Sequence, residues 1–290
     1  MRLVARGVRF IVLAAFAVFF VVPLIWLIVA PTKSDEAIAT RGPFAFGSLH
    51  NVVLAWNHLD AFSDHIYRAW IANSLVYALV ATAIVLATAI PAGYGLALST
   101  FPGRRVVLTL TLIVMIMPAA TLVLPIFLEL DALHLIGSAL SIILPFAFFP
   151  FGVYLAYIYY STAVPRELLD AARIDGCGEW STFRRIALPL AKPVVALVFF
   201  FSFVSDWNNF FLPYAVLADS SQYPIQVGLS NLLSSTPSFN PAVGGGGQQV
   251  NIFRPELALA TLLAVVPVAI VFLLSQRALV RGLVTGAVKS

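Results

Sequence analysis

Long apolar runs constrain this chain more than any other feature. Six stretches are apolar and long enough to cross a bilayer, because a spanning helix takes about 20 residues. They lie at about Arg9–Ala30, Trp70–Thr100, Val106–Leu128, Leu135–Tyr160, Val194–Leu217 and Leu257–Leu274. Of the 290 residues, 61% are hydrophobic and 10% are charged, which excludes a water-soluble domain and a disordered chain. The sequence predicts an all-α integral membrane protein with six transmembrane helices.

The first apolar run could also be read as a cleaved signal peptide, because Arg2, Arg6 and Arg9 precede it. It is about 20 residues long, however, which suits a span better than a signal sequence. It also contains Pro23 and Trp26, and no small-x-small cleavage pattern follows it. We therefore expect a retained span.

Basic residues are distributed unevenly between the two sides of this layout. With the N-terminus inside, the outer segments hold only Lys33, Arg41, Arg68 and Arg254 of the 17 basic residues. The inner segments hold the other 13, which are Arg2, Arg6, Arg9, Arg104, Arg105, Arg166, Arg173, Arg184, Arg185, Lys192, Arg277, Arg281 and Lys289. The positive-inside rule predicts an N-in, C-in topology and explains the net charge of +4 without a nucleic-acid partner.

Three parts are expected along the chain. Residues 1–69 form an N-terminal transmembrane helix with an extracytoplasmic segment, residues 70–277 form a five-helix transmembrane core, and residues 278–290 form a cytoplasmic tail. Within the core, residues 161–193 form a charged cytoplasmic loop that is far longer than a chain reversal requires.

The first half of this loop has the pattern of a short helix. Pro165 suits a first helical position, and Glu167 places a negative charge in the first turn. Asp170 and Arg173 are spaced to pair on one side. Gly176 can adopt the left-handed conformation that ends a helix.

A second short helix is expected after it, with Trp180, Phe183 and Ala187 on one face. In the first helix, Ala171 and Ala172 lack bulk, so another surface can approach closely. One reading is a solvated loop that merely reverses the chain. We favour a docking surface for a cytoplasmic partner.

The loop resembles the EAA motif of binding-protein-dependent ABC importer permeases. The motif keeps its spacing throughout, as Asp170-Ala171-Ala172, three residues, Gly176, nine residues, and Ile186-Ala187-Leu188-Pro189. Asp170 stands where the family usually has Glu, so the charge is retained on a shorter side chain. This resemblance implies the type I ABC importer permease fold.

Other segments resemble the maltose-type carbohydrate permeases, and the resemblance runs over nearly the whole chain. They are Asn73-Ser74, Phe101-Pro-Gly-Arg104, Trp207-Asn208-Asn209-Phe210 and Gly286-Ala-Val-Lys-Ser290. The implied function is import of a sugar, oligosaccharide or polyol across the cytoplasmic (inner) membrane of a prokaryote.

The sequence contains no phosphate-binding loop of the form G-x-x-x-x-G-K-[ST], so we expect a transport subunit rather than an enzyme. The resemblance implies that ATP and Mg are bound by a separate ABC ATPase dimer. Further implied partners are a second homologous permease subunit, an extracytoplasmic solute-binding protein and membrane lipid. The helix Glu167–Asp175 would be the coupling helix. The expected ATPase-coupling residues are Glu167, Asp170, Ala171, Ala172, Asp175, Gly176, Ile186, Leu188 and Pro189.

A polar and aromatic group near the outer end of the fifth span is a candidate substrate pathway. Its members are Asp206, Trp207, Asn208, Asn209 and Phe210. They could equally form part of an interfacial aromatic belt. Functionally, aromatic faces stack on sugar rings, whereas amides and carboxylates bind hydroxyls. The lack of Lys and Arg within the spans disfavours an anionic substrate. Because a partner subunit could supply positive charge, a glycerol-phosphate-type solute remains the alternative.

Prolines are frequent within or beside the spans, at Pro23, Pro91, Pro118, Pro125, Pro145, Pro150, Pro213 and Pro267. They indicate either ordinary helix kinks or broken helices along a moving pathway.

The outer segment Ser234–Arg254 is either a passive loop or a contact for the binding protein, through Gly244, Gly245, Gly246, Gly247 and Gln248. No metal site is expected, because His50, His58, His65 and His134 lack ligand spacing and read as solvated. The single cysteine, Cys177, excludes an internal disulfide.

Other classes fit less well. An ion-coupled secondary transporter needs intramembrane ionisable groups, which are nearly absent here. An integral-membrane enzyme needs clustered catalytic groups near one membrane face, and none is evident. Only the family motifs disfavour a secretion component that uses an ATPase.

Overall fold

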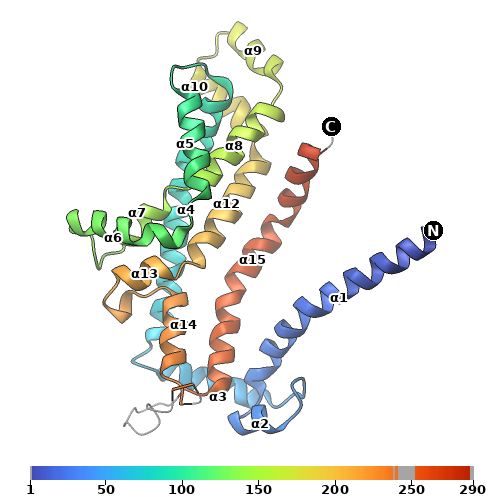
Figure 1. Cartoon of the computed structure of the whole chain (residues 1–290), viewed down its shortest axis with the longest axis vertical. Helices are drawn as coiled ribbons and strands as arrows, with labels where there is room; N and C mark the ends of the chain where they lie inside the picture. Colours follow the sequence, from blue (N-terminus) through green and yellow to red (C-terminus); the bar gives the residue numbers. More distant parts are fainter. Residues whose placement is uncertain (1, 238, 241–251, 288–290) are drawn as a thin grey trace. The chain divides into compact units, whose positions relative to one another are not determined.

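The computed structural model describes residues 2–237, 239–240 and 252–287, and over these residues the chain is built of helices and turns (Figure 1). In chain order they are α1 (Arg2–Val29), η1 (Ala30–Thr32), α2 (Asp35–Thr40), α3 (Leu49–Ala61), α4 (Ile66–Leu98), α5 (Arg104–Ile116), η2 (Ala119–Leu122), α6 (Val123–Ala132), α7 (Leu140–Phe146), α8 (Pro150–Thr162), α9 (Arg166–Ile174), α10 (Glu179–Thr182), η3 (Phe183–Ala187), α11 (Leu188–Leu190), α12 (Lys192–Trp207), α13 (Phe211–Val216), η4 (Ser220–Gln222), α14 (Ile225–Ser234) and α15 (Arg254–Ala287).

The described residues contain four to six candidate membrane spans. Four helices are long and apolar enough on their own, over Arg6–Thr32, Ile66–Leu98, Leu140–Thr162 and Arg254–Leu279. Two helix pairs qualify only together, being Arg104–Ile116 with Ala119–Ala132, bent by 102°, and Glu179–Leu190 with Lys192–Trp207, bent by 77°. Five of the predicted apolar stretches overlap these elements closely. The stretch Val194–Leu217 overlaps only Lys192–Trp207, because its bent pair begins at Glu179 and does not include α13. The described residues give six spans only if each bent pair is one span.

Three of the predicted spans are interrupted, as in the broken-helix alternative that the prolines left open. The stretch Val106–Leu128 breaks before Pro118, and Leu135–Tyr160 breaks before Pro150. A proline disfavours the helical conformation in the residue before it, and Met117 and Phe149 accordingly leave that conformation, with ψ of 127° and 85°. The stretch Val194–Leu217 breaks between α12 and α13. The last predicted span, Leu257–Leu274, is uninterrupted. Its helix, α15, continues to Ala287 and so includes most of the predicted tail 278–290.

The first compact unit comprises residues 1–70 and 227–266. Tyr67 and Trp70 of α4 are fully buried, and the Tyr67 hydroxyl donates a hydrogen bond to the Ala260 carbonyl of α15 (2.8 Å). Gly228 of α14 lies against the Trp70 indole, where an added Cβ would come within 2.8 Å of Cγ. The most apolar window of the first span is only 6% buried, so its surface is suited to contact with lipid.

An ion-paired turn joins α3 to α4 in this unit. Asp60 accepts hydrogen bonds from Arg68 Nε and Nη2 (2.7 Å for Nη2), and His65 Nδ1 lies 3.1 Å from its second oxygen. The bonds from Arg68 hold the pKa of Asp60 below its usual value. Ser63, Asp64 and His65 have positive φ values of 46°, 59° and 64°, so three consecutive residues of this turn adopt the left-handed backbone conformation. His65 is therefore paired with a carboxylate as well as exposed.

The start of α15 is tied to the N-terminal segment. The Arg254 guanidinium pairs with Asp35 (Nε to Oδ1, 3.0 Å), and His58 Nδ1 lies 2.8 Å from Glu256 Oε1. Glu256 is 5% exposed and also accepts the Phe253 backbone N–H (3.1 Å). The expectation that the histidines are simply solvated was thus incomplete, because His58 also has a buried carboxylate partner.

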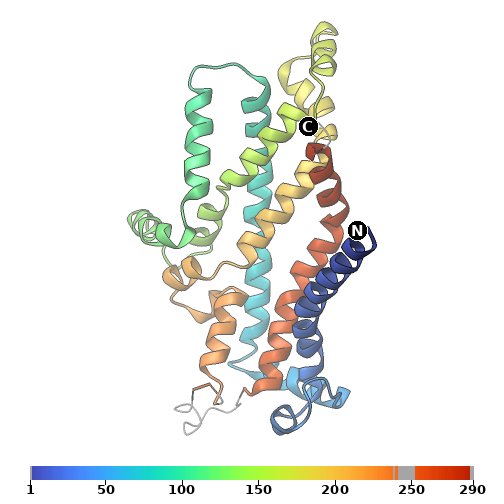
Figure 2. The same cartoon turned by 45° about the vertical axis from the view of Figure 1, so that its right-hand side comes forward.

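The second compact unit comprises residues 71–226 and 267–290. Within it α8 packs against both α5 and α12, α9 and α10 lie at one end, and α6, α7 and α13 gather at the other (Figure 1, Figure 2). Its main core cluster draws on α4, α8, α9, η3 and α12. Residues of α9 and η3, in the loop 161–193, therefore belong to the same core as the long apolar helices.

Helices α4 and α8 approach closely at Gly93. A Cβ at this position would meet Ala156 Cβ, and it would lie 2.7 Å from the Tyr157 backbone nitrogen. Ala89 and Ala156 are buried beside this contact. In lipid no hydrophobic force drives helices together, so their association depends on close van der Waals packing. Small residues such as these allow that packing.

We expect Gly93→Ala to lower the melting temperature of the detergent-solubilised protein, because overpacking of a close contact costs about 1–3 kcal/mol. Gly95→Ala is the matched control, since it lies on the same helix and its Cβ would meet nothing within 4 Å. Fluorescence-detected thermal unfolding compares the two. Equal melting temperatures would contradict the close approach at Gly93.

Candidate functional site

The first helix of the loop 161–193, α9, has a well-formed C-terminal cap. In α9, Gly176 takes φ = +80°, its N–H donates to the Arg173 carbonyl (3.0 Å), and the Cys177 N–H donates to the Ala172 carbonyl (2.9 Å). These two bonds form a Schellman motif, which satisfies the last carbonyls of the helix. The prediction that Gly176 ends this helix in the left-handed conformation is confirmed.

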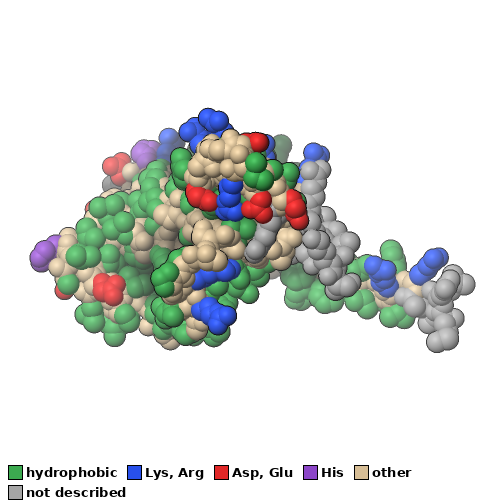
Figure 3. Space-filling model, turned by 90° about the horizontal axis from the view of Figure 1, so that it is seen from above, with side chains coloured by type: hydrophobic (Ala, Val, Ile, Leu, Met, Phe, Trp, Pro, Cys, Tyr) green, Lys and Arg blue, Asp and Glu red, His purple; other side chains and the backbone are tan. Residues whose placement is uncertain are grey.

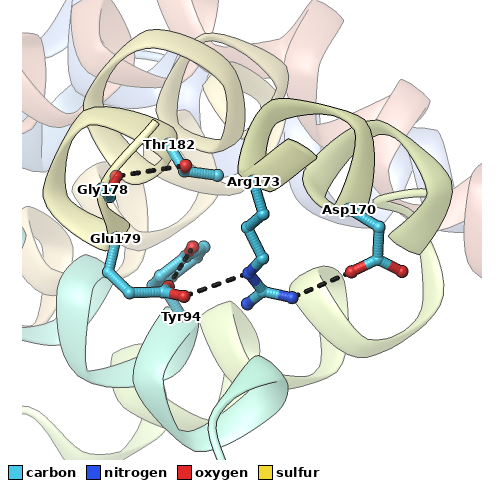
Figure 4. Close-up of polar contacts among 6 residues, drawn as sticks. All are labelled: Tyr94, Asp170, Arg173, Gly178, Glu179 and Thr182. Carbon is cyan, nitrogen blue, oxygen red and sulfur yellow. Dashed lines mark hydrogen bonds and ion pairs between the residues drawn. The ribbon is translucent and has the colours of Figure 1, made fainter. Parts of the chain in front are cut away.

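An ion and hydrogen-bond network links α9 to α10 and α4 (Figure 4). Arg173 lies between two carboxylates, donating from Nη1 to Asp170 Oδ1 (2.9 Å) and from Nε to Glu179 Oε1 (3.0 Å). The Tyr94 hydroxyl of α4 donates to the other oxygen of Glu179 (3.4 Å). The predicted pairing of Asp170 with Arg173 is confirmed. Glu179 and Tyr94 were not predicted, because the sequence does not show that α4 ends beneath this loop.

The two alanines of the motif face opposite ways. Ala172 is buried, with 5% of its surface exposed, as is Leu169, which belongs to the core cluster, whereas Ala171 is exposed. Leu168 and Ile174 are also exposed, at 47% and 87%. The expectation that both alanines leave room for a partner holds for Ala171, since Ala172 is already covered by this chain.

Charged side chains surround this exposed apolar strip. Glu167, Asp170, Asp175 and Glu179 are exposed, and the view onto this end shows acidic and basic side chains gathered there (Figure 3). Such a surface, apolar in the middle with a polar rim, is the usual anatomy of a protein–protein contact.

The second part of the loop is a helix with a π-helical turn. Phe183 and Ala187 lie in this turn and are buried, and the Tyr94 ring packs on Phe183 with centroids 5.0 Å apart. Trp180 was expected on one face with these residues. Its ring lies beside that of Phe183, with centroids 5.3 Å apart and the planes tilted by 32°, but Trp180 itself is 67% exposed. The helix is short before the π turn, and so Trp180 projects beyond the core.

The I-x-L-P part of the motif lies where this helix turns into α12. Ile186 and Leu188 are half-buried against the core cluster, and Pro189 is exposed. Leu188 and Pro189 line an apolar groove of about 550 Å³ together with residues of α4 and α12. These motif residues thus shape the base of the loop rather than its outer surface.

The three helix breaks of the second unit meet around one cavity of about 580 Å³. It is lined by residues at the α5–η2, α7–α8 and α12–α13 junctions: Met117, Ala119, Phe146, Phe148, Phe149, Pro150, Phe151, Asn208, Asn209, Phe210 and Phe211 among others. Non-helical backbone at membrane depth is tolerated where it lines a cavity, since its polar groups need partners. The cavity wall therefore combines aromatic rings with two amide side chains.

The predicted substrate-pathway group is divided by the structure. Asn208, Asn209 and Phe210 line the cavity, whereas Asp206 and Trp207 point elsewhere. Asp206 Oδ2 accepts hydrogen bonds from Thr82 (3.3 Å) and Ser202 (3.4 Å), which are buried. Trp207 is 1% exposed and stacks on Phe203 at 5.7 Å.

The aromatic part of the cavity was not predicted. Phe146, Phe148, Phe149 and Phe151 flank the α7–α8 break and face the cavity with Phe210. Pro145 and Pro150 were the available signal, because prolines mark possible breaks. Nothing in the sequence alone shows that three breaks converge.

The predicted contact for the binding protein, at Gly244, Gly245, Gly246, Gly247 and Gln248, lies outside the described residues, as do the last three residues of the tail. No group of three or more His, Cys, Asp or Glu side chains that could hold a metal occurs among the described residues.

Residues 89–285 match the family described as "Binding-protein-dependent transport system inner membrane component". The chain belongs to this family. It is thus a multi-pass protein of the inner membrane and a permease of the sugar ABC transporter group, as its relatives show.

Two relatives illustrate this. The arabinooligosaccharides transport system permease protein AraQ of Bacillus subtilis (strain 168) is 37% identical over 224 residues, covering 77% of this chain and 74% of that protein. The lactose transport system permease protein LacG of Rhizobium radiobacter is 30% identical over 282 residues, covering 97% and 96%. A chain from the crystal structure of a bacterial ABC transporter involved in import of the acidic polysaccharide alginate has the same fold, with a TM-score of 0.77, 23% identity and coverage of 94% and 96%.

We expect Gly176→Ala to loosen the C-terminal cap of α9, because a residue with a Cβ is destabilised by about 1–2 kcal/mol in the left-handed conformation. Gly178→Ala is the control. Both positions lie in open space, but Gly178 has φ = −68°. Amide hydrogen exchange over α9 should become faster in the first variant only. Equal exchange in both variants would contradict the capping role.

Proposed function

We propose that this chain is a permease subunit of an ATP-driven importer that moves a carbohydrate across the inner membrane. In this proposal the N- and C-termini lie inside, and α9 is the coupling helix that docks on a separate ABC ATPase. The chain provides part of the substrate pathway and the coupling helix, whereas ATP and Mg are bound by the ATPase dimer.

The observation that carries the coupling role is that α9 is joined rigidly to the spans on one side and open on the other. Leu169 packs into the core that also contains residues of α4, α8 and α12, and Ala172 is buried as well. The Arg173–Glu179–Tyr94 network adds polar links to α4. A displacement of the exposed face, at Ala171 and Ile174, would therefore be transmitted to the spans.

The cavity supports a carbohydrate as substrate. Sugar rings present apolar C–H faces that stack on aromatic rings, and their hydroxyls need hydrogen-bond partners. Phe149 and Phe210 supply rings, and Asn208 and Asn209 supply amides that both donate and accept. No Lys or Arg is among the described residues that line the cavity. An uncharged sugar, oligosaccharide or polyol suits this wall better than a glycerol-phosphate-type solute.

The proposed partners follow from the faces that the chain leaves open. The ATPase dimer would bind α9, and a second homologous permease subunit would complete the pathway. A solute-binding protein would deliver the substrate at the opposite side of the membrane, and lipid would surround exposed apolar helices such as α1.

The decisive experiment is purification of the tagged chain in mild detergent, followed by mass spectrometry. We expect a second permease and an ATPase with a phosphate-binding loop to co-purify. The ATPase activity should rise when the binding protein and the right sugar are added from a panel of sugars and phosphodiesters. A chain that purifies alone after gentle extraction and crosslinking would contradict the proposal.

Ala171→Leu sharpens this test, since it adds bulk to the exposed face of α9 without entering the core. Substrate-stimulated ATPase activity should fall by about ten-fold or more, as expected when about 1.4 kcal/mol of docking is lost. Ala132→Leu is the matched control, because Ala132 is exposed on α6 at the other end of the unit. Full stimulation in Ala171→Leu would rule out docking through this face.

Asn209→Ala tests the cavity. Loss of one amide that binds a sugar hydroxyl should raise the substrate concentration for half-maximal transport by about five- to ten-fold, equivalent to about 1 kcal/mol, with little change in the maximal rate. Asn57→Ala on α3 is the control, being exposed and outside the cavity. Uptake of radiolabelled sugar into proteoliposomes measures both. An unchanged half-maximal concentration would exclude Asn209 from the binding wall.

A further inference from the structure

A second polar pocket lies at the turn between α4 and α5, at the end of the unit that carries α9. It has a volume of about 540 Å³, and its walls include Thr100, Phe101, Arg104, Arg105 and Tyr157. Gly103 makes the turn possible, because it takes φ = +88° directly before α5. This pocket is separate from the proposed coupling surface and from the substrate cavity.

The positive charge of this pocket is not balanced within the described chain. Arg104 donates one long hydrogen bond to the Ala97 carbonyl (3.4 Å) and lies over the Tyr157 ring at 6.0 Å. Its Nε is buried and has no hydrogen-bond partner among the described atoms. Arg105 is exposed and takes part in none of the described ion pairs.

Helix electrostatics make this arrangement unfavourable as it stands. Arg104 and Arg105 occupy the first turn of α5, where the helix dipole repels cations, and no acidic residue is present in that turn. The described residues that line the pocket include no Asp or Glu. A bound anion would relieve the repulsion and pair with the guanidinium groups.

The pocket opens onto an apolar helix face. Val106 and Leu108 form part of its lining, and the exposed surface continues along α5 through Val107, Leu110 and Ile113, which are 43%, 55% and 51% exposed. The α4 span ends at Leu98, so the arginines lie at the level where lipid headgroups begin. A ligand that fits both parts has an anionic head and an apolar tail.

We propose that this pocket binds the headgroup phosphate of an anionic phospholipid, whose acyl chains lie along α5. Arg104 and Arg105 hold the phosphate, Thr100 offers a hydroxyl donor, and the apolar face of α5 receives the tail. The site ties the α4–α5 turn to the lipid surface beside the coupling segment.

Native mass spectrometry of the delipidated, detergent-solubilised assembly tests this proposal. The probes are a phosphatidylglycerol and a phosphatidylcholine with the same acyl chains, and inorganic phosphate as competitor. The phosphatidylglycerol should bind more tightly than the phosphatidylcholine. Arg105→Gln should weaken its binding by about five-fold, and the double variant with Arg104→Gln by about 25-fold, because each surface basic residue contributes about 1 kcal/mol to anionic lipid binding.

The matched control is the double variant Arg184→Gln with Arg185→Gln, which removes the same charge from an exposed pair outside the pocket. It should leave binding nearly unchanged. The single variant Arg105→Gln keeps the test valid if the double variant misfolds, because this exposed side chain makes no described hydrogen bond or ion pair. Equal binding of both lipids, or equal weakening by the control pair, would overturn the proposal. Displacement by millimolar phosphate would instead identify a soluble anion as the ligand.

Discussion

In a bilayer, backbone N–H and C=O groups must find partners inside the protein, and this constraint governs the second unit. Continuous helices satisfy it over most of the chain. The breaks before Pro118 and Pro150 and after Trp207 leave backbone groups without helical partners, and they meet around one cavity. Polar and irregular backbone is thereby collected at a single place, which is also the place where a hydroxyl-rich solute would find hydrogen-bond partners.

The same unit joins that cavity to the proposed coupling helix through one core. Leu169 of α9, Phe183 of the π turn and Tyr94 of α4 lie in the same cluster. Packed cores transmit displacement because they contain few voids and compress little. The exposed ion pairs around Arg173 contribute little to stability, since surface pairs are worth about 0–1 kcal/mol. Their role is to orient α9, whereas burial holds it in place.

Charge is placed sparingly, and each placement has a local physical reason. Asp206 is held among buried hydroxyls of Thr82 and Ser202. The carboxylates around α9 form the rim of an exposed apolar strip. Arg104 and Arg105 have no carboxylate partner in the part of the chain that the structure describes, which suits them to an anion from outside the chain. The exposed face of α9 therefore carries carboxylates and a paired arginine, whereas the pocket at the α4–α5 turn carries arginines without described carboxylate partners.

Much of this could be read from the sequence, because the signals involved are local. Apolar length located the spans, and proline and glycine punctuation placed the α9 helix and its cap at Gly176. The spacing of the motif around Asp170 and Gly176 indicated the family. These features depend on residues that are neighbours in the chain, so their physical consequences follow from sequence distance alone.

The tertiary structure decided the features that depend on contacts across the chain. It buried Ala172 and left Ala171 exposed, brought Glu179 to Tyr94, and separated Asn209 from Trp207 although they are two residues apart. It also brought three distant helix breaks to one cavity. A membrane helix is apolar on nearly every face, so its sequence carries little periodic signal to say which face meets a neighbour. Only the packing of small residues such as Gly93 and Ala156 determines that.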